Sequence, residues 1–311
     1  DQGDFDQSLE LLRSAVSMRR ETQGELHPDL ADATNNLAFV LAEAGELEEA
    51  LALYREALSM QRQLHGEEHT DIAVALGNVA YVLHVQGDYD AAAPTYEEVI
   101  AMQKKLLGER HPTVAVWLNN LAYLQYSNGN QQEAMALASE SLDIKREAFG
   151  NEHPEVADGL YTNGLWTMDS GDYARAESLL RESLAMNIEL RGRVHSDTAV
   201  SMVLLANCLL AIGEKEEALD LAVEARTNYA STIGGDHWRA AVAVGAEGAA
   251  LSQQGNFEQA EPLLLRSHDA LTKDPNARPR YVEQATQRLA ALYSEWGKPE
   301  RAAEFLALLK E

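Results

Sequence analysis

Several features that would point to a particular chemistry are scarce in this sequence. Cys208 is the only cysteine among 311 residues, so no internal disulfide can form, and such usage is typical of a reducing compartment. The longest uncharged run, residues 111–132, is too polar to cross a bilayer, and the sequence shows no signal peptide. These absences predict a cytoplasmic protein without membrane-spanning segments.

Basic residues are half as numerous as acidic ones, 25 against 50, which gives a formal net charge of −25. Nucleic-acid binding needs a basic stripe, and anionic membrane surfaces attract basic segments. We therefore expect neither nucleic acid nor membrane among the partners. Residues 1–110 hold 21 acidic and 8 basic side chains. This end would steer a basic partner toward itself, unless the charges only keep the protein soluble.

Motifs for catalysis are missing as well. The sequence has no phosphate-binding glycine loop, no dinucleotide-binding fingerprint and no His-Glu-x-x-His zinc motif. Cys208 stands in a helical pattern, where a buried cysteine is usually an inert small hydrophobic residue. Acidic pairs such as Glu48-Glu49 and Glu216-Glu217 are typical of solvated helix surfaces. We expect no catalytic residue, no cofactor and no enzymatic activity.

The sequence is instead dominated by a period. A glycine recurs every 21 residues, and every second glycine is followed three residues later by a histidine, so the full repeat has 42 residues and two halves. The glycines are Gly3, Gly24, Gly45, Gly66, Gly87, Gly108, Gly129, Gly150, Gly171, Gly192, Gly213, Gly234, Gly255 and, after one miss, Gly297. The histidines are His27, His69, His111, His153, His195 and His237. An alanine follows the other glycines after five residues, at Ala50, Ala92, Ala134, Ala176, Ala218, Ala260 and Ala302.

Each half repeat is predicted to be one helix and a turn. Apolar residues recur three and four positions apart between the glycines, which is the helical period. Glycine can close a helix in the left-handed conformation, and the His-Pro pairs at 27–28, 111–112 and 153–154 place proline in a first helical turn. A small residue also recurs in each first helix and lets the paired helices approach closely. These residues are Ala38, Ala80, Ala122, Gly164, Ala206, Gly248 and Ala290.

This pattern of a small residue, a glycine and an alanine resembles the tetratricopeptide repeat, which has them near its positions 8, 15 and 20. The 42-residue spacing, with Gly-x-x-His-Pro and with Asn-Asn-Leu-Ala at 35–38 and 119–122, is similar to the kinesin light chain-like subfamily. The resemblance implies an all-α fold, a right-handed superhelical solenoid of antiparallel helix pairs. It is most similar to a bacterial array of such repeats.

An unbroken repeat predicts one elongated solenoid over residues 1–311. It would begin in mid-repeat with an unpaired second-type helix at 4–22, as an excerpt of a longer protein. Residues 296–304 are similar to the last repeat of bacterial serine/threonine kinases that carry such arrays. Seven helix pairs are expected to follow the first helix, at 28–65, 70–107, 112–149, 154–191, 196–233, 238–273 and 279–310.

The histidine series could suggest a metal site, but its spacing argues against one. Adjacent repeats stack at a helix packing distance of about 10 Å, whereas zinc ligands all lie roughly 2 Å from one ion. We interpret the periodic histidines as turn and packing residues and expect no metal. His65, His84 and His268 stand outside the series and form no ligand spacing, so surface or groove roles suit them.

The resemblance implies that first helices line a concave wall, with repeat positions 2, 5, 6, 9, 12 and 13 pointing inward. In the first three repeats these positions carry an asparagine ladder beside an aromatic ladder. Asparagine can donate to and accept from a peptide backbone, and aromatic rings add apolar contact at low entropy cost. The same asparagines could instead bond to neighbouring first helices and hold the superhelix. The candidate peptide-binding residues are Asn35, Asn36, Phe39, Asn78, Tyr81, Asn119, Asn120, Tyr123, Tyr126, Thr162 and Asn207.

Arrays of this family that hold carboxylate tails of chaperones use lysine or arginine at positions 2, 5 and 6, and here Arg288 is the only basic residue in that set. The leading hypothesis is therefore a non-catalytic scaffold that holds an extended, neutral to basic peptide in the groove of repeats 1 to 4. The alternative is self-association, or regulation of a larger signalling enzyme such as a bacterial kinase. In that case Trp296 and the apolar C-terminal helix, residues 299–310, would form the contact.

Overall fold

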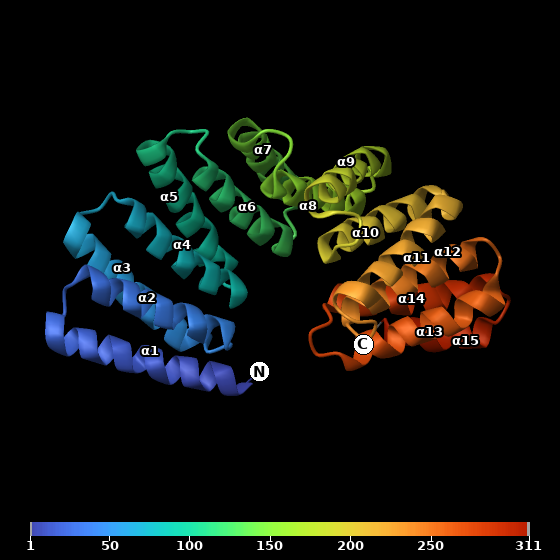
Figure 1. The fold of residues 1–311 in the computed structure, drawn as a ribbon, viewed down its shortest axis with the longest axis horizontal. Coiled ribbons are helices and arrows are strands. Elements are labelled where there is room, and N and C mark those ends of the chain that lie inside the picture. The colour runs from blue at the N-terminus through green and yellow to red at the C-terminus, as the bar shows by residue number, and fades with distance from the viewer. Residues whose placement is uncertain (1, 310–311) are drawn as a thin grey trace. The chain divides into compact units, whose positions relative to one another are not determined.

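The computed structural model describes residues 2–309, and over that range it contains helices and turns but no strand (Figure 1). The all-α prediction is confirmed. Asp1 and the expected end of the last helix at residue 310 lie outside the described residues. The helices are α1 (Gln2–Gln23), α2 (Pro28–Glu43), α3 (Leu47–His65), α4 (Thr70–Val85), α5 (Tyr89–Leu107), α6 (Pro112–Ser127), α7 (Gln131–Phe149), α8 (Pro154–Asp169), α9 (Tyr173–Arg191), α10 (Ser196–Ile212), α11 (Lys215–Thr232), α12 (Trp238–Gln253), α13 (Phe257–Lys273), α14 (Pro279–Glu295) and α15 (Pro299–Leu308).

The chain divides into two compact units, Asp1–Ala148 and Phe149–Glu311. Unit 1 contains α1 to α6 and α7 up to Ala148, and its core of buried residues includes Leu30, Tyr54 and Tyr96. Unit 2 contains α8 to α15 and has two hydrophobic clusters, a larger one around Met202 and a smaller one around Tyr293. In each unit, successive helices pack on their chain neighbours, as expected for a solenoid.

The periodic histidines cap the first helices of six pairs. In each case the ring Nδ1 accepts a hydrogen bond from the backbone N–H two residues later, at 3.1–3.2 Å. This bond satisfies one of the donors left free at a helix start. The glycines between the histidines close the helices: Gly213, with φ 87° and ψ 8°, ends α10 in the left-handed conformation. The repeat is therefore marked at both ends of each first helix.

Small residues on first helices accept large side chains from neighbouring helices. A Cβ added to Gly77 on α4 would lie 2.0 Å from Cη2 and 2.2 Å from Cζ3 of Trp117 on α6. The indole of Trp117, 9% exposed, therefore fills the space that a side chain at position 77 would take. Gly164 on α8 makes the same kind of space for Leu180 on α9, with Cγ 2.8 Å from an added Cβ.

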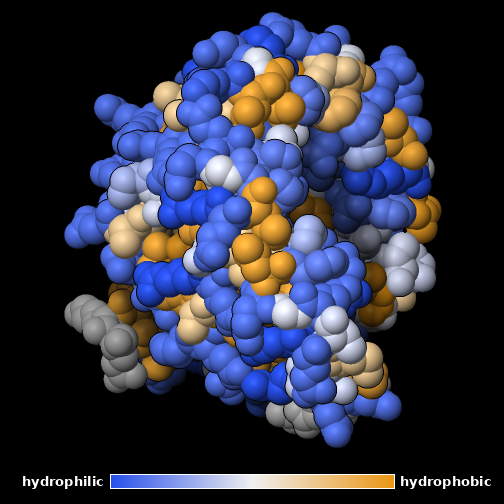
Figure 2. All heavy atoms as spheres, turned by 90° about the vertical axis from the view of Figure 1, so that its left-hand side faces the viewer, coloured by the Kyte–Doolittle hydropathy of each residue, from blue (hydrophilic) through white to orange (hydrophobic). Residues whose placement is uncertain are grey.

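Ion pairs connect successive second helices at a constant spacing of 36 residues. The cation of each pair comes from the earlier helix and the carboxylate from the later one. The pairs are Arg13–Glu49, Arg20–Glu56, Arg62–Glu98 and Lys104–Glu140 in unit 1 and Arg181–Glu217 in unit 2. Glu49 and Glu217 belong to these ion pairs, and their side chains stay exposed on the helix surface, as expected for them. Seen from the left-hand side of Figure 1, the surface is mostly hydrophilic, with small separate apolar groups (Figure 2).

Candidate functional site

Helices α2, α4 and α6 form one layer of unit 1, and α3, α5 and α7 form the other (Figure 1). Asn78 Nδ2 on α4 donates to Asn35 Oδ1 on α2 at 2.8 Å. His84 Nε2, also on α4, lies 3.3 Å from Ser127 Oγ on α6. These bonds hold the three first helices side by side. We name the exposed surface of α2, α4 and α6 the first-helix face.

Two apolar rows cross the first-helix face. Phe39, Tyr81 and Tyr123 occupy one repeat position and are 55, 42 and 42% exposed. Val74 and Val116, seven residues before the two tyrosines, are 43 and 46% exposed. Seven helical residues correspond to about 10 Å along the axis, so the two rows run parallel from helix to helix. Large apolar side chains that remain exposed at a fixed period make this face a candidate contact surface.

Asparagines lie between the two rows. Asn36, Asn78 and Asn120 stand three residues before the aromatic positions, and Asn36 is exposed whereas the other two are partly buried. Asn78 donates one amide hydrogen to Asn35, so this pair does hold neighbouring first helices together. The exposed amide of Asn36 shows that part of the ladder faces solvent. The contact between first helices is therefore observed for Asn35 and Asn78, and peptide binding by the asparagines remains a prediction.

A cavity of about 100 Å³ opens beside the valine row, between α2 and α4. Its lining includes Asp32, Asn35, Gln61, Asp71 and Val74. Gln61 is 6% exposed, and its Oε1 has no hydrogen-bond partner among the described residues. Asp71 pairs with histidines, and no lysine or arginine of the described chain pairs with Asp32 or Asp71. The cavity therefore offers more acceptors than donors.

Nine of the predicted peptide-binding residues lie together on α2, α4 and α6. Thr162 and Asn207 belong to unit 2, where Thr162 is buried and the Oδ1 of Asn207 accepts a hydrogen bond from Arg288 at 2.6 Å. Val74 and Val116 were not among the candidates, although their spacing of one repeat could have indicated them. Val85, 49% exposed on α4, was also missed, and no period marks it. The nine residues remain a predicted site.

His65, His69 and Asp71 come together at the turn between α3 and α4, although the sequence predicted no ligand grouping for His65. One potential ligand atom from each lies within 4.8 Å of the others. The two imidazole rings stack with centroids 4.2 Å apart and planes 13° apart. Parallel stacked rings cannot both direct a nitrogen lone pair at one ion. Phe149 stacks on His153 in the same way, which identifies the stack as a packing feature of the repeat.

The thiol of Cys208 is fully buried on α10 and lies 3.6 Å from the carbonyl oxygen of Tyr173. Burial raises the pKa of Cys208 to about 11. A nucleophilic thiol needs a lowered pKa and access to solvent. Cys208 has neither property and behaves as a core residue.

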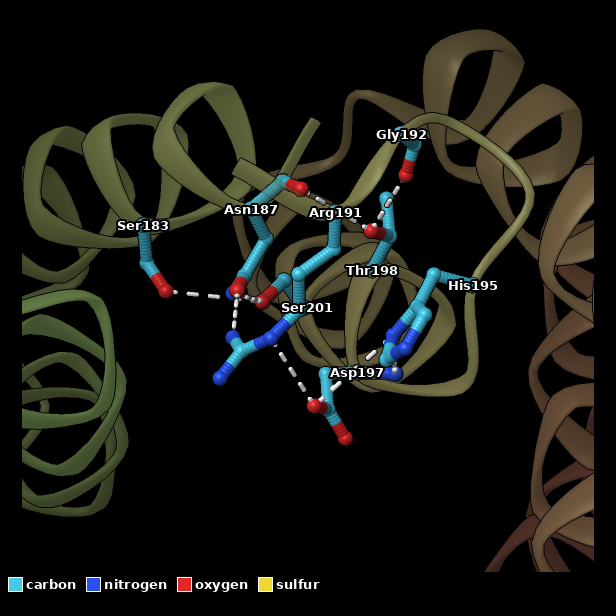
Figure 3. A network of polar contacts seen from close by, with 8 residues as sticks. All are labelled: Ser183, Asn187, Arg191, Gly192, His195, Asp197, Thr198 and Ser201. Atoms are coloured by element: carbon cyan, nitrogen blue, oxygen red, sulfur yellow. Dashed lines mark hydrogen bonds and ion pairs between the residues drawn. The ribbon is translucent and has the colours of Figure 1, made fainter. Parts of the chain in front are cut away.

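A polar network between α9 and α10 holds the turn that joins them (Figure 3). Asn187 Nδ2 donates to Ser201 Oγ at 3.0 Å, and Arg191 donates to Asn187 Oδ1. Arg191 Nε also lies 3.2 Å from Asp197 Oδ2, while Thr198 Oγ1 donates to the carbonyl oxygen of Gly192 at 2.8 Å. The network members bond to one another across the helix pair, which is a structural role.

One sequence model of the tetratricopeptide repeat matches residues 1–63, 29–105, 71–147 and 155–231. A second model with the same description matches residues 241–266. The chain belongs to the tetratricopeptide repeat family. Its helices are therefore repeats of a type that generally mediates protein–protein interaction on a non-catalytic scaffold. No helix within residues 2–309 has the length and apolar character needed to cross a membrane.

Solved structures share this tetratricopeptide fold. A Podosopora anserina protein described as a kinesin light chain with nearly identical TPR-like repeats is 24% identical, with a TM-score of 0.59, over 66% of this chain and 97% of its own. BtubC (BKLC) from P. vanneervenii is 22% identical, with a TM-score of 0.61, over 74% and 89%. A Rap protein complexed with Competence and Sporulation Factor is 14% identical, with a TM-score of 0.54, over 100% and 97%. A comparison with curated proteins gives no match.

Proposed function

We propose that this tetratricopeptide repeat protein is a non-catalytic scaffold that binds an extended peptide segment across the first-helix face of unit 1. The observation that carries the proposal is the pair of exposed apolar rows with asparagines between them. Apolar rows can hold side chains of the peptide, and an amide between them can bond to its backbone. The Rap protein solved with Competence and Sporulation Factor supports this use of the fold.

The geometry of the face suits an extended segment. Neighbouring helices pack about 8–10 Å apart, and an extended peptide advances about 3.3 Å per residue. A peptide that crosses the face would therefore place about three residues over each repeat. Its side chains would meet Phe39 and Asp32 on α2, and an aromatic residue and a valine on α4 and on α6, while its backbone runs past the asparagines. A segment of about nine residues would cover α2, α4 and α6.

The charge of unit 1 favours a neutral to basic segment. The cavity lined by Asp32, Asp71 and Gln61 presents acceptors without a lysine or arginine partner. A peptide lysine or arginine placed there would supply the missing donors and neutralise carboxylate charge. Arginine and lysine residues on the second helices of unit 1 are largely used in the ion pairs between repeats. These basic residues therefore do not neutralise the carboxylates of the first-helix face.

The test is selection from a random peptide display library on the intact protein, followed by affinity measurement on synthetic peptides. A Tyr81→Ala, Tyr123→Ala variant is expected to lose at least about tenfold in affinity, since two aromatic contacts each contribute about 1 kcal/mol or more. Tyr173→Ala is the matched control, because Tyr173 is 37% exposed on α9, outside the first-helix face. Unchanged affinity of the double variant would refute the assignment of this face. Circular dichroism checks that all variants remain folded.

A second candidate function, self-association, is favoured by one observation. Leu306 and Leu308 on α15 are 49 and 50% exposed. Trp296, which was predicted to take part, is partly buried: its ring stacks on that of Phe257 with centroids 5.8 Å apart, and Lys298 lies over it. Sedimentation equilibrium of the wild type and of a Leu306→Ser, Leu308→Ser variant tests this candidate. A wild type that stays monomeric at high concentration would exclude a homodimer.

A further inference from the structure

The cavity between α2 and α4 has a polar half and an apolar half. Its oxygen-bearing lining residues are Asp32, Asn35, Gln61 and Asp71, and its other lining residues are Ala31, Ala57, Val74 and Ala75. The side-chain oxygens come from three helices, α2, α3 and α4, so they surround the cavity instead of following one wall. Val74 also belongs to the valine row, which makes the cavity continuous with the first-helix face.

Gln61 is the buried polar side chain of this lining. It is 6% exposed, and its Oε1 accepts no hydrogen bond from the described residues. A buried oxygen without a donor is costly, so a ligand that brings a donor is favoured. Asn35 Oδ1 accepts from Asn78 at 2.8 Å, which fixes the amide and leaves a second lone pair on that oxygen. The lining contains no lysine or arginine to offset Asp32 and Asp71.

The equivalent place one repeat later, between α4 and α6, is closed. Trp117 stands at the repeat position of Ala75. Its indole fills the space beside Gly77, which stands at the repeat position of Asn35. The two aspartates are also replaced there by residues without charge, Val74 and Thr113. An open cavity lined by carboxylates is therefore particular to α2 and α4 and is no general feature of the repeat.

The balance of donors and acceptors differs between these two places. Gln103 stands at the repeat position of Gln61, and its Oε1 is also without a partner in the described chain. There the indole of Trp117 contributes an N–H group that is likewise unpartnered, so one donor is present for one acceptor. The cavity beside Gln61 has carboxylate and amide oxygens and no cationic donor of its own. A ligand is the remaining source of such a donor.

We propose that this cavity binds the ammonium group of a lysine side chain in preference to an arginine guanidinium; that the lysine belongs to a peptide on the first-helix face rests on the proposed function. An ammonium carries three donors on a compact group, which suits oxygens from three helices, and the apolar half of the lining can cover its methylene stem. A guanidinium is a planar fork that pairs best with one carboxylate. The cavity, at about 100 Å³, is smaller than one of about 150 Å³ that holds benzene, so the broad planar group fits less well.

A metal ion suits the lining less well than an ammonium does. Calcium takes about six to eight oxygen ligands. Four side chains of the lining carry oxygens, and the other four are alanines and a valine. The apolar half of the cavity has no use for a bare ion but can contact the carbon chain of a lysine.

Side-chain analogues test the cavity without a peptide. n-Butylammonium represents lysine, n-propylguanidinium represents arginine, N-butylacetamide represents acetylated lysine, and calcium chloride supplies the metal ion, all at pH 7 and one ionic strength. Binding to the intact protein is followed by the NMR signals of the Gln61 side-chain amide. We expect saturable shifts with n-butylammonium, binding of n-propylguanidinium that is at least about fivefold weaker, and no shift with N-butylacetamide.

Three results of this titration would overturn the proposal. They are the absence of a shift with n-butylammonium, equal or tighter binding of n-propylguanidinium or calcium, and shifts spread over the acidic surface instead of centred on Gln61. The Tyr81→Ala, Tyr123→Ala variant should bind n-butylammonium like the wild type. The cavity is thereby tested even if the first-helix face binds no peptide.

Lysine replacement in a peptide selected on the intact protein separates the two proposals. Each lysine is replaced in turn by arginine or by Nε-acetyllysine, and at one position both changes should lower the affinity at least about fivefold. A peptide that depends on Tyr81 and Tyr123 but tolerates every such replacement would refute the lysine site and keep the first-helix face. Binding of n-butylammonium without any selected peptide would refute the proposed function and keep the ammonium site.

Variants of the lining test the roles of the residues. Asp32→Asn should weaken n-butylammonium binding about threefold to fivefold, because its carboxylate is exposed, and Asp32→Asn with Asp71→Asn should weaken it at least about tenfold. Asp90→Asn, the same change at an exposed position on α5, should bind like the wild type. Gln61→Lys introduces the residue that Lys145 provides at the same repeat position, and its own ammonium should abolish binding. Circular dichroism checks that the variants are folded. Wild-type binding by the double aspartate variant or by Gln61→Lys would contradict the proposal.

Discussion

The contact between Gly77 and Trp117 predicts that Gly77→Ala destabilises the wild-type protein but stabilises a protein that lacks the indole of Trp117. In the wild type, Gly77→Ala introduces a Cβ at 2.0 and 2.2 Å from two ring carbons, whereas carbon atoms in contact lie about 3.5–4.0 Å apart. The indole would have to move by more than about 1 Å. It is 9% exposed and packs near Tyr96, with ring centroids 6.3 Å apart, so it cannot move without displacing α5.

Two opposing contributions to the free energy of unfolding decide whether Gly77→Ala stabilises or destabilises the wild type. Overpacking of this kind costs about 1–3 kcal/mol and sometimes more, and the severity of the contact places Gly77→Ala at the upper end. Replacing a helical glycine by alanine contributes about 1 kcal/mol in the other direction. The expected net loss is about 2 kcal/mol. Trp117→Ala alone should cost about 3–5 kcal/mol through the cavity it leaves. In that background Gly77→Ala meets no ring and should stabilise by about 1 kcal/mol, so the coupling energy is about 3 kcal/mol.

Hydrogen exchange of the α4 to α6 amides is the appropriate assay, because repeat arrays open locally. The four proteins are the wild type, both single variants and the double variant, with helix content checked by circular dichroism. Gly235→Ala is a control, since its added Cβ would meet only the Cβ of Ala230 at 4.0 Å. Additivity of the two substitutions within about 0.5 kcal/mol, as for independent sites, would refute the reasoning.

Three further predictions follow from local contacts. His153→Ala removes a helix cap and should lower the free energy of unfolding by about 0.5–2 kcal/mol, measured in urea; an unchanged midpoint would contradict the capping role. Cys208, with its pKa at about 11, should react with iodoacetamide at pH 8 only as fast as the chain opens; rapid labelling of the native protein would exclude the buried thiol. The hydrogen bonds from Arg181 lower the pKa of Glu217, so the pair stabilises the fold above the unfolded pKa of about 4.3 and loses this contribution as the pH falls below it. Glu217→Gln should therefore cost about 0.2–1 kcal/mol at pH 7 and progressively less as the pH falls through the folded pKa of Glu217, in thermal unfolding scans.

The helical repeat could be predicted from the sequence because both ends of each first helix are marked. Histidine stands at the start and glycine near the end, and apolar residues between them follow the helical period. The capping role of the histidines was not predicted. Histidine is not among the preferred N-cap residues, and the periodic histidines were predicted to be turn and packing residues.

Contacts between residues far apart in the sequence could not be predicted from it. Arg288 and Asn207 are 81 residues apart and meet only because α12 presents Gly245 between them. The contact between Gly77 and Trp117 likewise depends on which residue of one repeat faces which residue of the next. The aromatic and asparagine positions of the first-helix face, by contrast, follow directly from the period. Their use in peptide binding remains a prediction for the affinity measurements.

The 36-residue spacing of the ion pairs has a consequence for how such arrays can change in length. The pairs of Arg20, Arg62 and Lys104 share one repeat position, and their carboxylates share another in the next repeat, so partners within this set are interchangeable. Removal of residues 66–107 would bring Arg62 opposite Glu140 in the place of Glu98. Duplication of a whole repeat would preserve the pairing in the same way. Whole repeats of unit 1 can therefore be gained or lost while this ion pair is kept at the junction.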